Sequence, residues 1–371
     1  MHQAMFDHWL SPVSMGQFTD FAELSNQQWG KCLQVFHEEM PHLSGVKIAL
    51  IGVGEAEADR VRRHLYTMSF PFSGLAVADL GNVRKTSTQF LIPLVKELLN
   101  SKILPIIIGN DDSIIEAQYL AYQSLKQLIN LVAIDERVRY YTEADGPTGY
   151  LNQILENPRS HLFHLGVIGY QSHYTPPLVI DHLQQHHYEC TRLGYARAHL
   201  EEIEPLVRDA DLFCFNLASL RQSEAPGQAA PSPCGFFVEE ACQISRYAGL
   251  SDKVTSAGFY GFRSQWDQRD QTAQVVAQLI WYFVDGVYHR KNDYPSSTDS
   301  LVEYIVDFRD QEYQITFWKS NKSGRWWMQV PVKTKRKHER HTLIPCSYQD
   351  YQLASQEELP QRLLDAYKRF M

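Results

Sequence analysis

The sequence has no closely paired cysteines and no long apolar run. Its six cysteines are scattered over 371 residues and none forms a Cys-x-x-Cys pair, which disfavours a zinc ribbon or a redox dithiol. No stretch is apolar for long enough to span a bilayer, and residues 1–12 lack a basic start followed by an apolar core. We therefore expect no signal peptide, no membrane span and a reducing, cytoplasmic location.

The sequence also lacks an excess of basic residues. Its 35 Lys and Arg against 43 Asp and Glu give a formal net charge of −8, which argues against general nucleic-acid binding. The hydrophobic fraction of 44% and the charged fraction of 21% are ordinary for a globular protein. The length allows one large domain and an appendage.

Short apolar runs alternate with helical patterns from about residue 46 to about residue 288. The run 104–108 is apolar throughout, whereas 89–100 places leucines at helical spacing. Strands that are apolar on both faces and alternate with helices predict a parallel sheet covered by helices on two sides. In such a sheet the ligand crevice lies beyond the carboxyl ends of the strands.

Polar residues stand where three of these apolar runs end. Gly-Asn-Asp-Asp-Ser occupies 109–113, Asp-Glu-Arg-Val-Arg occupies 135–139 and Asn-Leu-Ala occupies 216–218. Because side chains on a strand alternate faces, the first, third and fifth residues of the second segment are expected to point the same way. The candidate site residues are Asp111, Asp112, Asp135, Arg137, Arg139, Asn216 and Ala218.

These strand ends resemble the motifs of the arginase/agmatinase/formimidoylglutamase (ureohydrolase) family. The family motifs read Gly-Gly-Asp-His-Ser, Asp-Ala-His-x-Asp and Ser-Phe-Asp-x-Asp, and they bind two manganese ions. The resemblance runs from about residue 47 to about residue 288, and it includes an Ala-Pro-Gly at 225–227. It implies a three-layer α/β arginase-like fold with a central parallel sheet.

The metal-ligand positions depart from the family pattern. Asp112 and Arg137 stand where the resemblance places histidines, and Arg139, Asn216 and Ala218 stand where it places aspartates. Two divalent cations require several carboxylates, supplemented by neutral histidine, whereas arginine adds a fixed positive charge. We therefore interpret these positions, with the retained aspartate 135, as a degenerate metal site, and we expect no metal, no cofactor and no catalytic residue.

Two other family positions are changed as well. Relatives carry a catalytic histidine in a loop whose counterpart is 142–150, where this sequence has none, and Gly261 stands where they carry a glutamate that binds the guanidino group. We expect Arg137 and Arg139 to replace the metal ions by pairing with the aspartates at 111, 112 or 135. The alternative is that the two arginines bind a small anionic ligand.

The pattern changes after residue 295. Three alternating runs separated by turn residues predict a small antiparallel β-meander, followed by a basic run at 333–341 and two helices. Ser347 and Asp350 have the spacing of a capping box. The predicted domains are an N-terminal helical segment at 1–45, an arginase-like α/β domain at 46–295 and a C-terminal β-meander with helices at 296–371.

The C-terminal extension carries a candidate partner-binding patch. Trp326, Trp327 and Arg336 combine aromatic and basic side chains, as interfaces commonly do. Adjacent residues on a strand face opposite sides, so at most one tryptophan is expected to pack in the core. The other is expected to be exposed or covered by the final helices.

Histidines supply weaker candidates. His182 and His186 have metal-ligand spacing on one helix, but the sequence places no third ligand beside them, and a solvated helix end is the simpler interpretation. We interpret His164, on an apolar strand, as a core histidine with a hydrogen-bond partner rather than as a base.

These patterns together predict a non-catalytic protein. It would bind a partner protein through the C-terminal extension, or a small anionic ligand in the crevice. One alternative is a divergent formimidoylglutamase-like hydrolase of C–N bonds in linear amidines, in which a metal-bound hydroxide attacks the amidine carbon. Another is a structural subunit, because members of the family are commonly oligomeric.

Overall fold

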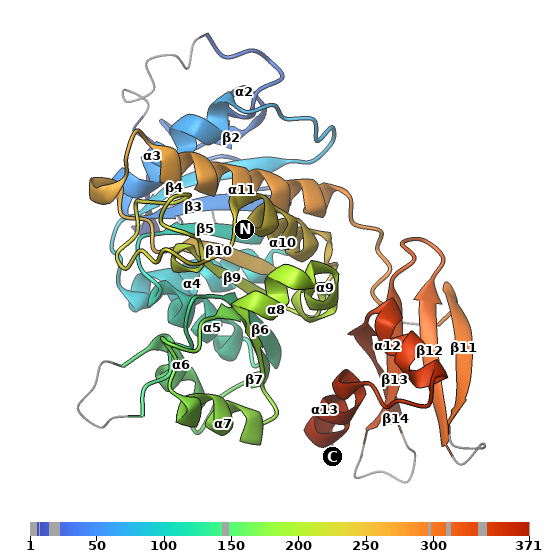
Figure 1. Cartoon of the computed structure of the whole chain (residues 1–371). Helices are drawn as coiled ribbons and strands as arrows, with labels where there is room; N and C mark the ends of the chain where they lie inside the picture. Colours follow the sequence, from blue (N-terminus) through green and yellow to red (C-terminus); the bar gives the residue numbers. More distant parts are fainter. Residues whose placement is uncertain are drawn as a thin grey trace.

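The computed structural model describes residues 6, 8–14, 23–142, 148–295, 298–308, 313–332 and 340–370. Within them the chain forms a large α/β unit and a smaller C-terminal unit, which lie side by side in Figure 1. The α/β unit contains a ten-stranded sheet, and the C-terminal unit contains a four-stranded sheet. No helix of the described residues is long and apolar enough to cross a membrane.

The large sheet is parallel apart from one short strand at its edge. Its order is β1-β4-β3-β5-β10-β9-β6-β7-β8, with β2 also paired to β4, and only β1 is antiparallel to its neighbour. The strands are β1 (Leu10–Ser11), β2 (Gln34–Val35), β3 (Ile48–Val53), β4 (Val77–Val83), β5 (Leu104–Gly109), β6 (Ile129–Ile134), β7 (Leu162–Tyr170), β8 (Glu189–Arg192), β9 (Leu212–Asn216) and β10 (Ser256–Tyr260).

Helices cover both faces of this sheet, as the sequence predicts. The helices are α2 (Trp29–Cys32), α3 (Glu55–Thr67), α4 (Thr88–Asn100), α5 (Ile114–Ser124), α6 (Tyr150–Leu155), α7 (Pro177–Gln185), α8 (Leu193–Ala198), α9 (Leu200–Arg208), α10 (Val238–Leu250) and α11 (Gln271–Tyr288). One face packs against α3, α9, α10 and α11, and the other against α4, α5, α6 and α7. The three-layer α/β prediction is confirmed.

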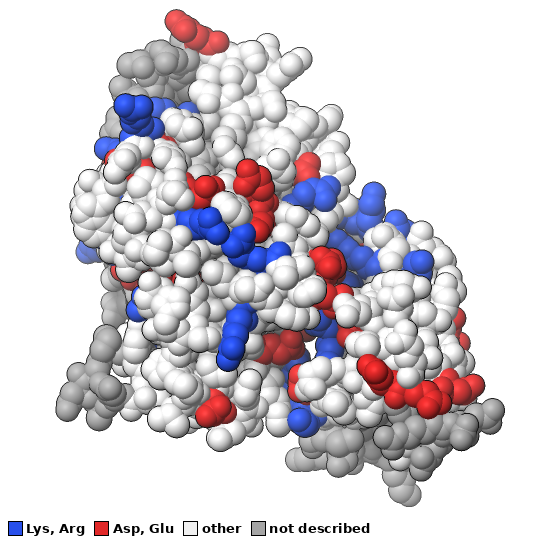
Figure 2. Space-filling view, viewed as in Figure 1, with Lys and Arg blue, Asp and Glu red and all other residues white. Residues whose placement is uncertain are grey.

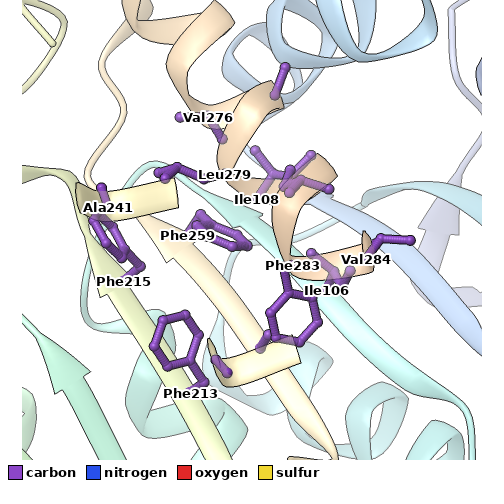
Figure 3. Close-up of a cluster of buried hydrophobic side chains, with 14 of the residues drawn as sticks. Ile106, Ile108, Phe213, Phe215, Ala241, Phe259, Val276, Leu279, Phe283 and Val284 are labelled. Carbon is purple, nitrogen blue, oxygen red and sulfur yellow. The ribbon is translucent and has the colours of Figure 1, made fainter. Parts of the chain in front are cut away.

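The two cores follow from the alternation of side chains along each strand. Ile106 and Ile108 of β5 enter one apolar cluster, whereas Ile107 between them enters the other. On the first face the ring of Phe213 in β9 stacks on that of Phe283 in α11, with 6.2 Å between ring centroids (Figure 3). Strands buried on both faces hold the strand ends in fixed positions, which is what a site at those ends requires.

The N-terminal segment differs from the prediction of a helical segment at 1–45. Leu10 pairs antiparallel with Val83, and Gln34 pairs parallel with Ala78, so two short strands join the sheet beside β4. Helix α2 spans only four residues. The physical reason is the free edge of β4, whose unpaired backbone groups accept these strands as hydrogen-bonding partners.

The C-terminal unit contains the predicted meander and one further strand. Its elements are β11 (Leu301–Phe308), β12 (Tyr313–Ser320), β13 (Trp326–Val332), β14 (Arg340–Cys346), α12 (Tyr348–Ser355) and α13 (Gln361–Phe370). The predicted capping box is present, because Ser347 Oγ accepts from Asp350 N at 3.1 Å and the Asp350 carboxylate accepts from Ser347 N at 2.8 Å. Strand β14 was not predicted.

The two tryptophans of β13 do not form an exposed patch. Trp326 is 7% exposed and its ring lies 5.0 Å from that of Tyr351 in α12. Trp327 is 1% exposed and packs on the opposite side, 4.6 Å from the guanidinium of Arg208 in α9. The prediction of a partner patch at these residues is therefore wrong, because helices cover both sides of the strand. Arg336 lies outside the described residues.

Candidate functional site

The strand order brings the three polar strand ends to one edge of the sheet. Strands β5, β10, β9 and β6 are consecutive parallel neighbours, so their carboxyl ends are adjacent. Asp111 and Asp112 follow β5, Asn216 ends β9, and Asp135 follows β6. The candidate site residues meet although Asn216 is 104 positions from Asp112 and 81 positions from Asp135 in the sequence.

Asp135 is the buried centre of the site. Its side chain is 1% exposed, and its carboxylate accepts two hydrogen bonds from Arg139, from Nε and Nη2, each at 3.1 Å. It also accepts from Asn216 Nδ2 at 3.1 Å. A two-donor contact from one guanidinium is the strong geometry for an arginine–carboxylate pair.

Arg139 also pairs with Asp112, and so links the first and second strand ends. Its Nε lies 3.2 Å from Asp112 Oδ2, which Asn216 Nδ2 approaches at 3.4 Å. Burial alone would lower the pKa of Arg139, but Asp135 and Asp112 outweigh it, and its pKa is raised. Burial raises the pKa of Asp112, although Arg139 opposes that rise. The guanidinium thus lies between the two carboxylates as a fixed charge.

Asn216 orients this pair through both ends of its side-chain amide. Its Nδ2 points at the two carboxylates, while its Oδ1 accepts from the backbone N–H of Ala218 at 3.0 Å. That last contact caps a short 3-10 helix at Leu217–Ser219. Because the oxygen is used by the backbone, the amide presents its donor and not its acceptor to the carboxylates. The buried methyl group of Ala218 offers no ligand atom.

Arg137 is directed elsewhere than predicted. Its Nε donates to Glu136 at 2.7 Å, and its guanidinium lies 4.9 Å from the ring centroid of Tyr174. The expectation that Arg137 pairs with an aspartate is wrong in this structure. Strand β6 ends at Ile134, so the alternation of faces does not continue through the following residues.

Glu136 and Arg263 are site residues to which the sequence analysis gave no role. Arg263 Nη2 donates to Asp111 at 3.1 Å, and Asp111 also accepts from the backbone N–H of Ser113 at 2.9 Å. Burial works against ionisation of Asp111, but these contacts outweigh it and lower its pKa. Burial raises the pKa of Glu136 despite the neighbouring arginines. Arg263 follows β10, at the same edge of the sheet. This position after a strand is the feature of the sequence from which its place in the site could have been predicted.

The charges of the site are close to balance. Four carboxyl groups, from Asp111, Asp112, Asp135 and Glu136, face three guanidinium groups, from Arg137, Arg139 and Arg263. Each of these guanidiniums has a carboxylate partner within 3.2 Å. A small anion would have to compete with those carboxylates.

The side chains do not fit a pair of divalent metal ions. The nitrogen of Arg139 lies between the two carboxylates that would have to act as ligands, and Asn216 presents an N–H group to them. Within the described ranges, no group of three or more His, Cys, Asp or Glu side chains is placed to hold a metal ion. Oxygen-rich metal sites instead depend on several carboxylates free of positive partners.

The contacts of the candidate histidines are with residues other than the candidate site residues. His182 stacks on Tyr140 with 5.0 Å between ring centroids, and His186 contacts the backbone carbonyl of His182. His164 is 1% exposed and its Nε2 lies 3.0 Å from Glu189. His164 therefore has the hydrogen-bond partner that a core histidine needs.

Fold and site together define an α/β protein with a three-layer ureohydrolase architecture and an ion-paired site at the carboxyl edge of its sheet. The family model for the arginase family matches residues 51–285. The chain belongs to the arginase family. The match covers the sheet from the second half of β3 to β10, the helices from α3 to most of α11 and all three polar strand ends, and it ends before the C-terminal unit.

The relatives found by sequence and by structure include formimidoylglutamases. The formimidoylglutamase of Staphylococcus aureus (strain bovine RF122 / ET3-1) is 24% identical over 226 residues, which are 56% of this chain and 72% of that protein. The Trypanosoma cruzi formiminoglutamase solved with Mn²⁺ is 16% identical, with a TM-score of 0.61, covering 67% of this chain and 96% of that one. Formimidoylglutamase from Bacillus subtilis is 20% identical, with a TM-score of 0.59, covering 66% and 88%. At these identities the structural likeness establishes the fold.

Proposed function

We propose that this protein is a non-catalytic member of the arginase family, a pseudoenzyme in which an arginine has taken the place of the metal ions. The observation that carries the proposal is the position of Arg139, whose guanidinium pairs with Asp112 and Asp135 at once. A buried carboxylate cluster needs positive charge, and a fixed guanidinium supplies it without a metal. The site then stabilises the strand ends and performs no chemistry.

The charge balance favours a binding role that does not use this site. All three guanidiniums of the site are paired with carboxylates. A small anionic ligand held by Arg137 and Arg139 is therefore less well supported, because it would have to displace those carboxylates. The proposed work of the protein is therefore binding through another surface, whether to a partner protein or within an oligomer.

The rival function is hydrolysis of a linear amidine, as the names of the formimidoylglutamase relatives suggest. It would require Arg139 to leave its two carboxylates so that metal ions could enter. Relatives that carry manganese make this the second candidate, and metal content distinguishes the two.

The test is elemental analysis of the purified protein after incubation with Mn²⁺ and gel filtration. The native chain is expected to retain less than a tenth of an equivalent, and to show no release of ammonia or formamide from formimidoylglutamate. A variant that restores the family ligands is expected to gain metal, because it replaces Arg137 and Arg139 with ligand side chains and supplies the other missing ligands. Its five substitutions are Asp112→His, Arg137→His, Arg139→Asp, Asn216→Asp and Ala218→Asp.

Arg159→Asp is the control for charge reversal, since Arg159 is exposed and lies outside the site. It should leave the metal content unchanged. One or two equivalents of manganese in the native chain, with turnover of formimidoylglutamate, would reject the pseudoenzyme proposal in favour of the hydrolase.

A further inference from the structure

A cavity lies at the edge of the large sheet opposite the ion-paired site. It has a volume of about 600 Å³ and opens beside the amino ends of β3, β5 and β10, whereas the ion-paired site lies at the carboxyl ends. Its lining residues are Lys47, Leu75, Leu99, Lys102, Ile103, Leu104, Val254, Thr255, Val287, Tyr288, Arg290 and Asn292. That volume is within the range of pockets that hold small organic ligands.

Three cations and no acidic residue line this cavity. Lys47, Lys102 and Arg290 come from three separate segments, one before β3, one after α4 and one after α11. Within the described part of the chain, no carboxylate oxygen lies within 4.0 Å of the side-chain nitrogens of these three residues. The chain has a net charge of −8, so a cavity whose charged side chains are all positive differs from the average surface of the molecule.

Backbone carbonyls hold Arg290 in place. Its Nε donates to Gly249 O and its Nη2 to Val254 O, each at 2.9 Å. Burial lowers the pKa of Arg290 to about 10, and the charge of Asp252 opposes that fall only in part. An arginine whose hydrogen bonds go to neutral carbonyls can gain a direct ionic partner when an anion enters the cavity.

Nearby acidic side chains are committed to other groups. The carboxylate of Asp252 accepts from the backbone N–H groups of Asn292, Asp293 and Tyr294, at 2.8 to 3.3 Å. Asp211 Oδ2 accepts from Asn130 N at 2.8 Å and lies 3.4 Å from Lys253 Nζ. Both carboxylates therefore bind backbone N–H groups, and Asp211 also pairs with Lys253, rather than with the cations that line the cavity.

Lys102 stands in an unfavourable backbone position. Its φ is +56°, in the left-handed region that glycine or asparagine adopts at lower cost after a helix. The neighbouring α4 supplies Leu99, and the following residues Ile103 and Leu104 are almost fully buried. This turn thus places a lysine directly beside an apolar wall.

The rest of the cavity lining is largely apolar. Leu75, Leu99, Val254 and Val287 line the cavity together with the two buried residues after Lys102. Figure 2 shows basic side chains gathered where the chain leads from the end of α11 toward the C-terminal unit, with few acidic ones among them. Positive and aliphatic groups that line one cavity suit a molecule with an anionic head and an apolar body.

We propose that this cavity binds an amphipathic organic anion, with a carboxylate or phosphate-ester head against Lys47, Lys102 and Arg290 and an apolar chain against the leucines and valines. The proposal does not depend on the state of the ion-paired site, because the two lie at opposite edges of the sheet. It assigns a ligand class to a face of the molecule that the family motifs do not reach.

Calorimetric titration of the full-length protein with decanoate tests this assignment. Decanoate is expected to bind at least tenfold more tightly than decanol, which lacks the charge, and than acetate, which lacks the apolar chain. Its affinity should fall as sodium chloride is raised from 50 to 500 mM, since head-group recognition is electrostatic. Decyl phosphate, run in parallel, tells whether the head is better matched by a phosphate ester or by a carboxylate.

A double variant, Lys47→Gln/Lys102→Gln, identifies the cavity as the site. Both lysines are exposed, so the fold should be kept, and the affinity for decanoate should fall at least tenfold. The matched control is Lys126→Gln, because Lys126 is also exposed and also has a positive φ, of +57°, but does not line the cavity.

Three results would overturn the proposal. They are no saturable binding of either decanoate or decyl phosphate, equal affinity for decanoate and decanol, and an unchanged affinity in the double variant. Thermal unfolding of each variant shows whether it is folded. If the double variant is not folded, the proposal is tested by the salt dependence of decanoate binding and by the comparison of decanoate with decanol and acetate.

Discussion

At the scale of single residues, Arg139 determines what the site can do. Its side chain is 16% exposed and it pairs with a carboxylate that is almost fully buried. Removing one partner of a buried pair leaves the other charge without compensation, and this costs about 3 to 5 kcal/mol. Arg139→Ala is expected to lose that much of the free energy of unfolding, measured with urea.

Arg63→Ala is the control for this substitution. Its side chain is 46% exposed and lies 3.6 Å from Asp270, so its loss should cost less than about 1 kcal/mol. In the double variant Asp135→Asn/Arg139→Met, part of the stability lost in Arg139→Ala should return, because the most deeply buried carboxylate of the site is then neutral. Equal losses for Arg139→Ala and Arg63→Ala would contradict the buried-pair argument.

Gly261 lies beside Asn216 of the site, at a position where the backbone conformation favours glycine. Its φ is +88°, and an added Cβ would lie 2.9 Å from Asn216 Oδ1. The left-handed backbone alone costs a residue with a side chain about 1 to 2 kcal/mol. Gly261→Ala is therefore expected to destabilise the protein by more than Gly74→Ala, since Gly74 has a φ of +80° but open space around it. Equal losses in urea unfolding would show that the contact with Asn216 does not matter.

The residues of the site could be predicted in part. The strand-end pattern brought Asp112, Asp135 and Asn216 to one edge, because parallel strands align their carboxyl ends. The direction of Arg137 could not be predicted, since alternation of faces holds only while the strand continues. The pairing of Arg263 with Asp111 joins residues 152 positions apart, which no local pattern encodes.

At the scale of secondary structure elements, the contact between α13 and the edge strand β8 depends on one carboxylate. Glu189 of β8 accepts from Arg369 at 3.1 Å, lies 3.9 Å from Arg362, and pairs with His164 of β7. Burial alone would raise the pKa of Glu189, but the hydrogen bond from His164 and the charges of the two arginines outweigh it and hold that pKa far below its ordinary value.

Because the pKa of Glu189 is lowered on folding, its contribution to the free energy of unfolding depends on pH. A carboxyl group whose pKa is depressed on folding stabilises the protein above its unfolded pKa, about 4.3, and this contribution is lost as the pH falls toward the folded pKa. Glu189→Gln should therefore be less stable than the native chain at pH 7, and the difference should shrink below about pH 4. Glu201→Gln, at an exposed glutamate, is the control and should show no such trend. A constant difference between pH 7 and pH 3 would contradict the role given to Glu189.

Most elements could be predicted, and the exceptions have physical causes. The buried strands and amphipathic helices of the α/β unit follow from periodicity alone. Strand β14 was missed because it follows a basic run and contains Pro345, which removes a backbone donor and suits an edge strand. The two strands near the N-terminus are two residues long, and pairing with β4 rather than a sequence pattern defines them.

At the scale of the whole molecule, Arg208 joins the two units. Its Nη2 donates to the backbone carbonyls of Trp326 and Cys346, at 3.1 and 3.2 Å, and its guanidinium covers the ring of Trp327. The bonds link α9 to two strands of the small sheet, 118 and 138 residues later in the chain. The sequence could not predict this contact, because any backbone carbonyl can accept from an arginine.

A single unfolding transition is expected from this connection. Tryptophan fluorescence, which includes the buried tryptophans of β13, and far-ultraviolet circular dichroism, which is dominated by the larger unit, should change together on heating the native chain. Arg208→Ala removes two charge-assisted hydrogen bonds, each worth about 1.5 to 3 kcal/mol. The part of the fluorescence change that comes from Trp318, Trp326 and Trp327 of the small sheet should therefore occur at a lower temperature than the dichroism transition. Arg197→Ala, which removes a pair with Glu240 inside the α/β unit, should lower both transitions equally. Separate transitions in the native chain, or coincident ones in Arg208→Ala, would show that the units are not coupled through Arg208.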